Sequence, residues 1–332
     1  MTSTQSNWSA WQPLPGNWAP TPSILAETLD GGQAFRWCRD QNEIWTGVWS
    51  DSIAQLRLGE GKVEWRTLES HQPQVASTLP HYLGLDSDWA ALADSLPWRS
   101  DPHLARCMAA FPGLRLLRQP FGETLLGFLC SATKQIVQIK QMVALLAERH
   151  GTTLGWNAAS GRVSSASRTP RSTSSPSGHD GPLPAANRLP TWAELAAIPE
   201  EKLRACQLGF RARFIHDTAQ FLAGNPGWLD ETEHLPYASA KARLMELPGV
   251  GEKVADCVLL FGAGKLEAFP VDTWILKALA RRYQLDGWKP AQVAQFGRAH
   301  FGPFAGYAQQ FLFSWERKHG SGRTDQFLPE SR

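Results

Sequence analysis

The feature that most constrains this chain is the stretch Leu247-Pro248-Gly249-Val250-Gly251. Pro-Gly often forms the turn between two helices, so the stretch predicts a tight hairpin between two helices. Gly249 and Gly251 can adopt positive φ and bring bare backbone N–H groups to a surface on either side of Val250, where they can hold a phosphate. Taken alone, the hairpin could also be a purely structural turn.

Lys253 follows this hairpin, at the start of a second predicted helix. The apolar residues after it recur at helical spacing, and the N-terminus of such a helix adds a positive dipole beside the hairpin. That dipole and partial burial both favour the neutral amine, which a lysine needs in order to attack carbon at neutral pH. Lys253 is therefore a candidate nucleophile; the alternative is an exposed lysine that only contacts phosphate.

Asp272 comes after Pro270-Val271 and opens a further predicted helix over 273–282. Aspartate is a good helix N-cap, so a structural cap is the simplest interpretation of Asp272 alone. A lysine and an aspartate placed close to one phosphate-binding hairpin indicate catalysis more specifically than either residue does alone. Together they predict an amine nucleophile that works beside a carboxylate.

Short segments rich in aromatic and β-branched residues occupy 35–37, 44–49, 53–58 and 62–66, and they predict an antiparallel sheet. From about Asp88 onward, apolar residues recur three and four positions apart, as in helices. We therefore predict an α+β fold. Its parts are a polar N-terminal tail over 1–22, an antiparallel sheet domain over 23–105, a mostly helical domain over 106–320 with the helix-hairpin-helix at 240–283, and a tail over 321–332.

The segment 157–190 is rich in Ser, Pro, Gly, Arg and Thr. It is too polar to bury a core, so we predict a disordered insertion within the helical domain. Arg162, Arg168 and Arg171 could give it loose affinity for DNA, although simple solvation is the preferred interpretation.

Composition restricts partners and location. The formal net charge is +2, so a nucleic-acid surface must be a local basic patch. The five cysteines have no paired short spacing, which fits a reducing compartment. The N-terminal residues lack an apolar signal region, and no segment approaches about 18 apolar residues. We expect a monomeric protein of the cytoplasm or nucleoid in bacteria, or of the nucleus in eukaryotes, with no membrane contact.

The segment 244–283 resembles the helix-hairpin-helix and Gly/Pro-Asp signature of base-excision DNA glycosylases, and among them the 8-oxoguanine DNA glycosylases. The resemblance extends over ordered blocks along most of the chain, at 32–37, 114–119, 128–131, 208–213, 302–309 and 312–314. The tail after Phe313 has no cysteine, which argues against the branches of the superfamily that carry an iron–sulfur loop near that position.

The resemblance implies a bifunctional glycosylase and abasic-site lyase that acts on double-stranded DNA containing oxidised guanine. A damaged purine flips out of the duplex, Lys253 attacks the sugar carbon, and Asp272 stabilises the positive charge that develops on the sugar. The resulting Schiff base allows β-elimination of the strand. This chemistry needs no metal and no other cofactor.

The resemblance also assigns recognition residues. Gly32 matches a glycine whose carbonyl accepts the N7 hydrogen of 8-oxoguanine, and Gln309 a glutamine that reads the Watson–Crick edge. Phe313 and Cys257 match the residues on the two faces of the base, with core packing as the alternative for both. The predicted DNA-binding residues are Phe210 as a wedge, Arg211 near the orphaned base, Thr133, and the hairpin residues Gly249, Val250 and Gly251.

The chain departs from the family where the opposite base is read. Thr133-Lys134-Gln135 replaces a run of asparagines, and Gln138 stands where a second arginine is expected. Trp274 replaces a histidine two residues after the aspartate. These changes put specificity for an opposite cytosine in doubt. The alternative functions are a glycosylase for another damaged purine and a catalytically silent damage-binding protein.

Overall fold

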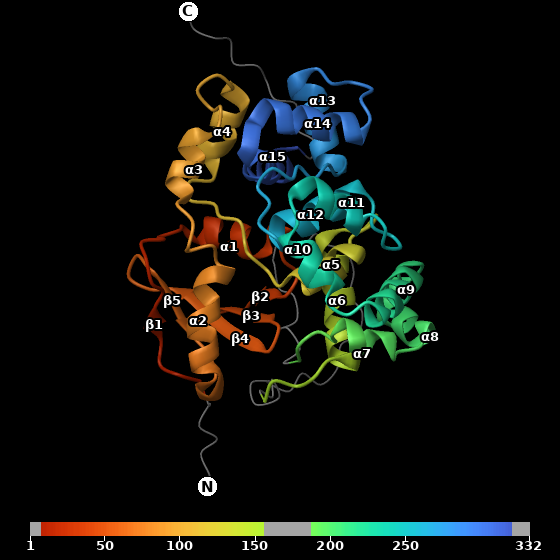
Figure 1. Cartoon of the computed structure of the whole chain (residues 1–332). Helices are drawn as coiled ribbons and strands as arrows, with labels where there is room; N and C mark the ends of the chain where they lie inside the picture. Colours follow the sequence, from red (N-terminus) through yellow and green to blue (C-terminus); the bar gives the residue numbers. More distant parts are fainter. Residues whose placement is uncertain (1–7, 156–186, 321–332) are drawn as a thin grey trace, which may run out of the picture.

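The computed structural model describes residues 8–155 and 187–320, which form an α+β fold (Figure 1). The sheet is antiparallel with strand order β1-β5-β4-β3-β2. Its strands are β1 (Gln12–Pro13), β2 (Trp37–Arg39), β3 (Trp45–Trp49), β4 (Ser52–Leu58) and β5 (Val63–Arg66). The predicted sheet is confirmed, with boundaries one or two residues from those expected.

Aromatic side chains hold the sheet to helix α2 (Gln72–Tyr82). The rings of Trp37 and Trp49 stack with centroids 6.1 Å apart, and the Trp49 ring lies 4.7 Å from that of Tyr82. The Trp37 indole donates a hydrogen bond of 3.0 Å to the Tyr82 hydroxyl, which satisfies both polar ends inside the core. Trp37 and Trp49 therefore serve packing between the sheet and α2.

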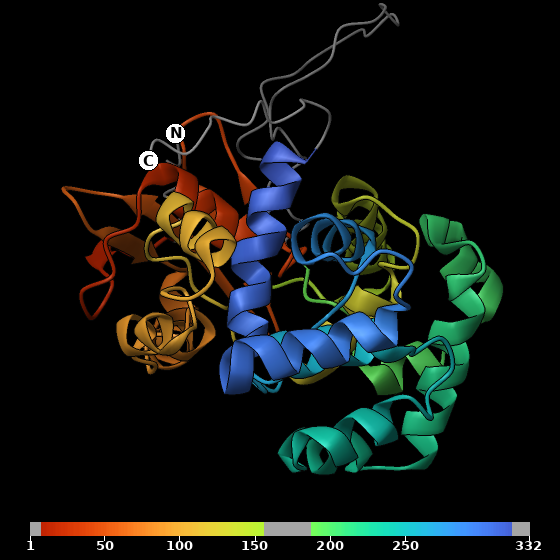
Figure 2. The same ribbon diagram turned by 90° about the horizontal axis from the view of Figure 1, so that it is seen from above.

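The remaining helices form the larger part of the molecule. They are α1 (Pro22–Asp30), α3 (Trp89–Ser95), α4 (Pro102–Ala110), α5 (Phe121–Leu129), α6 (Ile136–His150), α7 (Trp192–Ala196), α8 (Glu200–Leu203), α9 (Arg211–Gly224), α10 (Trp228–His234), α11 (Tyr237–Leu244), α12 (Glu252–Phe261), α13 (Thr273–Tyr283), α14 (Pro290–Phe301) and α15 (Ala305–His319). Seen from above, the helices drawn in green, α7 to α11, form an arc on the side opposite the sheet (Figure 2). None of the helices in the described parts is long and apolar enough to cross a membrane.

The predicted helix-hairpin-helix consists of α11, α12 and the turn between them. Asp256 of α12 is buried and accepts hydrogen bonds from Lys241 Nζ (3.0 Å) and the Tyr237 hydroxyl (2.7 Å), both on α11. Burial raises the pKa of Asp256, and the charge of Lys241 opposes that rise. This buried pair joins the two helices and fixes the turn.

The prediction of a tail over 1–22 is wrong for residues 8–22. Strand β1 pairs with β5, and the side chains of Leu14 and Trp18 are buried. Pro13 can occupy β1 because this strand lies at the sheet edge, where an N–H is not required. Because polar residues separate these buried apolar residues, the sequence did not predict that the segment packs against the sheet. Residues 321–332 lie outside the described parts.

The sheet domain contains helices that the sequence did not predict, namely α1 between β1 and β2, and α2 after β5. The predicted insertion also ends earlier than expected. Leu189 is buried and Asn187 pairs with Thr153, so residues 187–190 belong to the fold. The rest of the insertion, up to residue 186, lies outside the described residues.

Candidate active site

Lys253 lies in the first turn of α12 with its amine over the end of α5. Its Nζ donates a hydrogen bond of 3.0 Å to Ser131 Oγ and lies 5.1 Å from the ring centroid of Phe128. Ser131 in turn donates to the carbonyl of Phe128, at 2.6 Å. The hydroxyl's only proton is therefore occupied, and its lone pairs are left to accept from the amine. The contact fixes the direction of the Lys253 side chain.

Cys257 lies one helical turn after Lys253 and is buried. Burial raises the pKa of this thiol to about 12, although the charge of Lys253 acts to lower it. The thiol is therefore protonated at neutral pH and does not compete with the amine as a nucleophile. Cys257 thus lies beside Lys253, and its contact with a base stays a prediction.

Asp272 is the N-cap of α13, as predicted. Its carboxylate accepts a hydrogen bond of 2.8 Å from the Ile275 N–H. Burial raises the pKa of Asp272, while the N–H groups of Ile275 and Trp274 and the charge of Lys253 oppose that rise. Lys253 and Asp272 therefore interact across the gap between α12 and α13. A carboxylate with little water around it gains most from a positive charge that develops nearby.

Gly32 lies against Phe313, although the two are distant in sequence. Gly32 has φ +104°, and a Cβ there would be 3.1 Å from Ile136 Cδ1 and 3.4 Å from Phe313 Cε1. A larger residue would be strained by the backbone angle and crowded on two sides. Because glycine has no side chain, the backbone at Gly32 can come close to the ring of Phe313.

Gln309 lies one turn before Phe313 on α15 and is buried. Its Nε2 donates to the Pro270 carbonyl at 3.1 Å, two residues before Asp272. Its Oε1 has no hydrogen-bond partner among the described residues. A buried amide oxygen without a partner is costly, so this atom is available for donors on a ligand. The side chain joins the Gly32–Phe313 contact to the Lys253–Asp272 pair.

The hairpin agrees with the prediction at one glycine and corrects it at the other. Gly249 has φ +78°, and a Cβ there would lie 2.6 Å from the Phe214 ring of α9. Gly251 is extended at φ −95°, so it does not need positive φ, and a Cβ there would meet nothing within 4 Å. Val250 is buried and anchors the turn. The open space at Gly251 leaves its backbone accessible.

Phe210 and Arg211 occupy different environments. The ring of Phe210 is 53% exposed, as a wedge requires. Arg211 is buried, with its guanidinium 4.3 Å from the centroid of that ring. It donates to the Ala132 carbonyl and, at 3.1 Å, to Thr133 Oγ1. Arg211 thus supports the turn at Thr133 from behind, and its contact with an opposite base stays a prediction.

Sequence reasoning gave no role to Ser131, although its block was recognised. Only the fold brings α5 beside α12 and so reveals the contact with Lys253.

The structure also shows where the residues that depart from the family pattern lie. Gln138 is exposed, and its Oε1 accepts from the Gln135 N–H at 3.2 Å as part of the cap of α6. Trp274 lies partly exposed in the first turn of α13.

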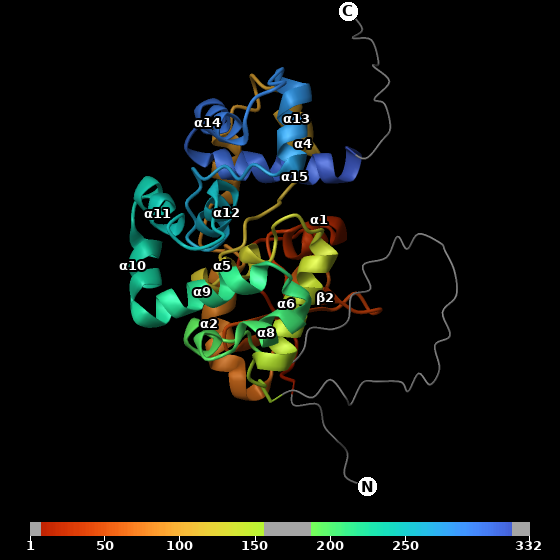
Figure 3. The same ribbon diagram turned by 90° about the vertical axis from the view of Figure 1, so that its right-hand side faces the viewer.

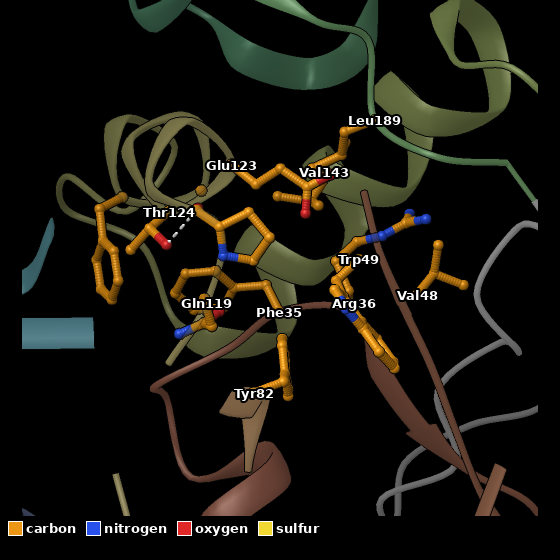
Figure 4. Close-up of a pocket in the computed structure, with 13 residues that line it drawn as sticks. Phe35, Arg36, Val48, Trp49, Tyr82, Gln119, Glu123, Thr124, Val143 and Leu189 are labelled. Atoms are coloured by element: carbon orange, nitrogen blue, oxygen red, sulfur yellow. Dashed lines mark hydrogen bonds between the residues drawn. The ribbon is translucent and has the colours of Figure 1, made fainter. Parts of the chain in front are cut away.

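A separate small cavity lies between the sheet and α5 (Figure 4). Its wall includes Arg36, Glu123 and one side of Phe128. The Ser50 N–H donates to Glu123 at 2.9 Å. Burial raises the pKa of Glu123 to about 7, and the charge of Arg36 opposes this. The cavity does not include Lys253 or Asp272, so we assign it to the junction of the two domains.

Family models match most of the described chain. Residues 20–125 match the description "8-oxoguanine DNA glycosylase, N-terminal domain", and residues 131–300 match "HhH-GPD superfamily base excision DNA repair protein". The second match includes Lys253, Cys257 and Asp272.

Named relatives are similar over nearly the whole chain. The N-glycosylase/DNA lyase OGG1 of Arabidopsis thaliana is 28% identical over 91% of this chain and 79% of the relative. The N-glycosylase/DNA lyase of Saccharomyces cerevisiae is 28% identical over 90% of this chain and 85% of the relative. The structure of Clostridium acetobutylicum 8-oxoguanine glycosylase/lyase, bound to double-stranded DNA with cytosine opposite 8-oxoguanine, is 28% identical. It covers 89% of this chain and 92% of that chain, with a TM-score of 0.75.

Proposed function

The chain belongs to the 8-oxoguanine DNA glycosylases of the HhH-GPD superfamily of base excision DNA repair proteins, and on that premise we propose which residues carry out its reaction. The enzyme is a bifunctional DNA glycosylase and lyase that excises 8-oxoguanine. The observation that carries the residue assignment is the amine of Lys253, held by Ser131 beside the half-buried carboxylate of Asp272.

In the proposed reaction, the Lys253 nitrogen forms a bond to the sugar carbon of a flipped nucleotide while the bond from that carbon to the base breaks. The base leaves with the bonding electrons and takes up a proton. Asp272 stabilises the positive charge on the sugar, and its ionised form is required. Loss of a proton from the nitrogen and opening of the sugar give the Schiff base, from which β-elimination breaks the strand.

We assign base recognition to the neighbouring residues. The carbonyl of Gly32 accepts the N7 hydrogen, which 8-oxoguanine has and guanine lacks. The free Oε1 of Gln309 accepts from the donors of the Watson–Crick edge. Phe313 supports one face of the ring, and Cys257 the other. The hairpin at 249–251 and the exposed Phe210 would hold the distorted duplex.

This chain has few side chains in its described parts that are free to contact the base opposite the lesion. Gln138 is engaged in capping α6, and Thr133 is engaged by Arg211. We therefore propose that excision depends only weakly on the base opposite the lesion, and that the enzyme works as a monomer. Sedimentation of the free protein and of its DNA complex would test the second statement.

The deciding experiment is borohydride trapping with duplexes that carry 8-oxoguanine opposite each of the four bases. We expect a covalent adduct with the wild-type enzyme, none with Lys253→Gln, and slower formation with Asp272→Asn. Lys62→Gln, which changes an exposed lysine between β4 and β5, is the control and should behave as wild type. Base release without an adduct would refute the lysine mechanism. Bound but intact lesion DNA would indicate a binding protein.

A further inference from the structure

Three helices meet at Gly32. This residue follows the C-terminus of α1, and a Cβ on it would lie 3.1 Å from Cδ1 of Ile136, the first residue of α6, and 3.4 Å from Cε1 of Phe313 on α15. Figure 3 shows α1 lying against α15 and near α6. The position of the Gly32 carbonyl is therefore fixed by how these helices are held relative to one another.

The first connection is an ion pair between α1 and α6. Asp30 Oδ1 lies 2.7 Å from Lys140 Nζ, and the two side chains are only 9% and 16% exposed. Asp30 is two residues before Gly32, and Lys140 is one helical turn after Ile136. The pair thus crosses from α1 to α6 next to the Gly32–Ile136 contact.

The second connection is an ion pair between α1 and α15. Glu27, which is 1% exposed at its side chain, accepts from Arg317 at 2.5 Å, and Lys318 lies 3.7 Å from the same carboxylate oxygen. Arg317 is one turn after Phe313. A Cβ on Gly31 would lie 2.7 Å from Glu27 Oε1, so this carboxylate also rests directly on the turn that presents Gly32.

We propose that these two ion pairs, Asp30–Lys140 and Glu27–Arg317, are positioning elements that set the enzyme's discrimination between 8-oxoguanine and guanine. Each pair joins α1 to one of the two helices that Gly32 touches, one turn from the contact. Together they hold the Gly32 carbonyl against movement toward either side. The proposal rests on the assignment of Gly32 as the acceptor of the N7 hydrogen.

Rigidity matters because the two bases differ at N7. With 8-oxoguanine the carbonyl accepts a hydrogen bond, and with guanine it faces a lone pair. A fixed carbonyl therefore favours one base and repels the other, whereas a carbonyl that can move by a fraction of an ångström relieves the repulsion. Weakening either pair should reduce the difference between the bases. The chemistry at Lys253 should be retained.

The test uses duplexes that carry a non-cleavable 2′-fluoro nucleoside of either 8-oxoguanine or guanine, and the ratio of their dissociation constants. The main variants are Lys140→Met and Arg317→Met, which keep most of the stem at partly accessible positions. Asp30→Asn and Asp30→Asn with Lys140→Met complete a cycle. Borohydride trapping on a duplex with a preformed abasic site measures lysine chemistry without base recognition.

We expect each single variant to lower the ratio by about tenfold and the double variant to be no worse than Lys140→Met, with trapping on abasic DNA within about twofold of wild type. Asp101→Asn is the control for loss of a buried charge. Its carboxylate bonds to Leu104, Tyr283 and His300, on α4, α13 and α14.

A ratio that stays at the wild-type value in Lys140→Met and Arg317→Met, or that falls equally in Asp101→Asn, would overturn the proposal. A wild-type enzyme that binds both bases equally would refute the role of Gly32 itself, and this proposal with it. A lost ratio together with lost trapping on abasic DNA would show general damage to the site and would also count against positioning.

Discussion

At the scale of single residues, Ser131 determines how the lysine is presented. Its hydroxyl donates to Phe128 and accepts from Lys253 at 3.0 Å. Ser131→Ala removes the acceptor and allows the amine to rotate. Because one such hydrogen bond contributes about 1 kcal/mol, we expect the single-turnover rate of trapping to fall about fivefold, with unchanged affinity for lesion DNA.

The matched control for this prediction is Ser314→Ala. Ser314 is also buried, and its hydroxyl has no hydrogen-bond partner among the described residues. The Ser314→Ala substitution removes a buried hydroxyl and leaves the contacts of Lys253 unchanged. Equal rates in the two variants would show that Ser131 has no special effect on the amine. A loss of DNA affinity in Ser131→Ala would assign it to binding.

The sequence identified the residues whose chemistry is local to one motif. Lys253 and Asp272 could be predicted because a hairpin, a helix start and an N-cap are all readable from short spacings. Ser131 could not, since its contact depends on α5 lying beside α12. Arg211 was recognised, but its burial under the turn at Thr133 depends on packing between α9 and the end of α5.

At the scale of elements, the two hairpin glycines should respond differently to the same substitution. Gly249→Ala introduces a Cβ at φ +78° and 2.6 Å from Phe214, so it should destabilise the fold by more than about 1 kcal/mol. Gly251→Ala meets open space and should leave stability within about 0.5 kcal/mol. If the backbone at 251 contacts phosphate, only this variant should weaken DNA binding without unfolding the protein.

Urea unfolding and a DNA titration of both variants check this contrast. Wild-type affinity in a stable Gly251→Ala protein would mean that phosphate does not approach this amide closely. Wild-type stability in Gly249→Ala would mean that the turn can move away from α9. Either result would be inconsistent with the hairpin geometry described above.

The junction between the sheet and α5 should make stability depend on pH. The pKa of Glu123 is raised to about 7 by burial; Asp51 adds to the rise, whereas Arg36, Arg188 and the Ser50 N–H oppose it. The folded state therefore holds the proton more tightly than the unfolded chain. The proton's contribution to stability is full at a pH below about 4.5, is lost as the pH rises from there through about 7, and does not change further at higher pH.

Glu123→Gln stays neutral at every pH and removes this dependence. We expect the free energy of unfolding of the wild type, relative to this variant, to fall by about 3 kcal/mol between pH 4.5 and pH 8. Urea unfolding at several pH values measures the difference. A constant difference would show that the carboxylate ionises as readily in the folded protein as in the unfolded chain.

The sequence also predicted most elements. Alternation and turns indicated β2 to β5, because these strands pair with neighbours in sequence. Strand β1 was missed because two residues carry no alternation, and its pairing with β5 is remote in sequence. Helix α1 was missed because its nine residues show too little of a repeating pattern, and α2 was missed because Pro80 lies inside it.

At the scale of the whole molecule, the ends of the segment 156–186 are joined by the fold itself. Thr153 and Asn187 form an antiparallel bridge, and the Arg188 N–H donates to the Thr152 carbonyl at 2.9 Å. The Asn187 side chain also donates to the Ala147 carbonyl of α6 at 3.1 Å. These contacts do not involve the segment between them, so the stability of the core should be nearly independent of the length of that segment.

Replacement of 156–186 by a short Gly-Ser linker should therefore preserve folding and excision, since each halving of loop length changes stability by only about 0.6 kcal/mol. The replacement also tests where DNA affinity resides in a chain of net charge +2. If Arg162, Arg168 and Arg171 are only solvated, affinity and its dependence on salt should match the wild type. If they contact phosphates, the slope of log affinity against log salt should become shallower by about one per contact. Titration at several salt concentrations separates the two outcomes, and we expect the first, because we propose that DNA is held by the hairpin at 249–251 and by Phe210.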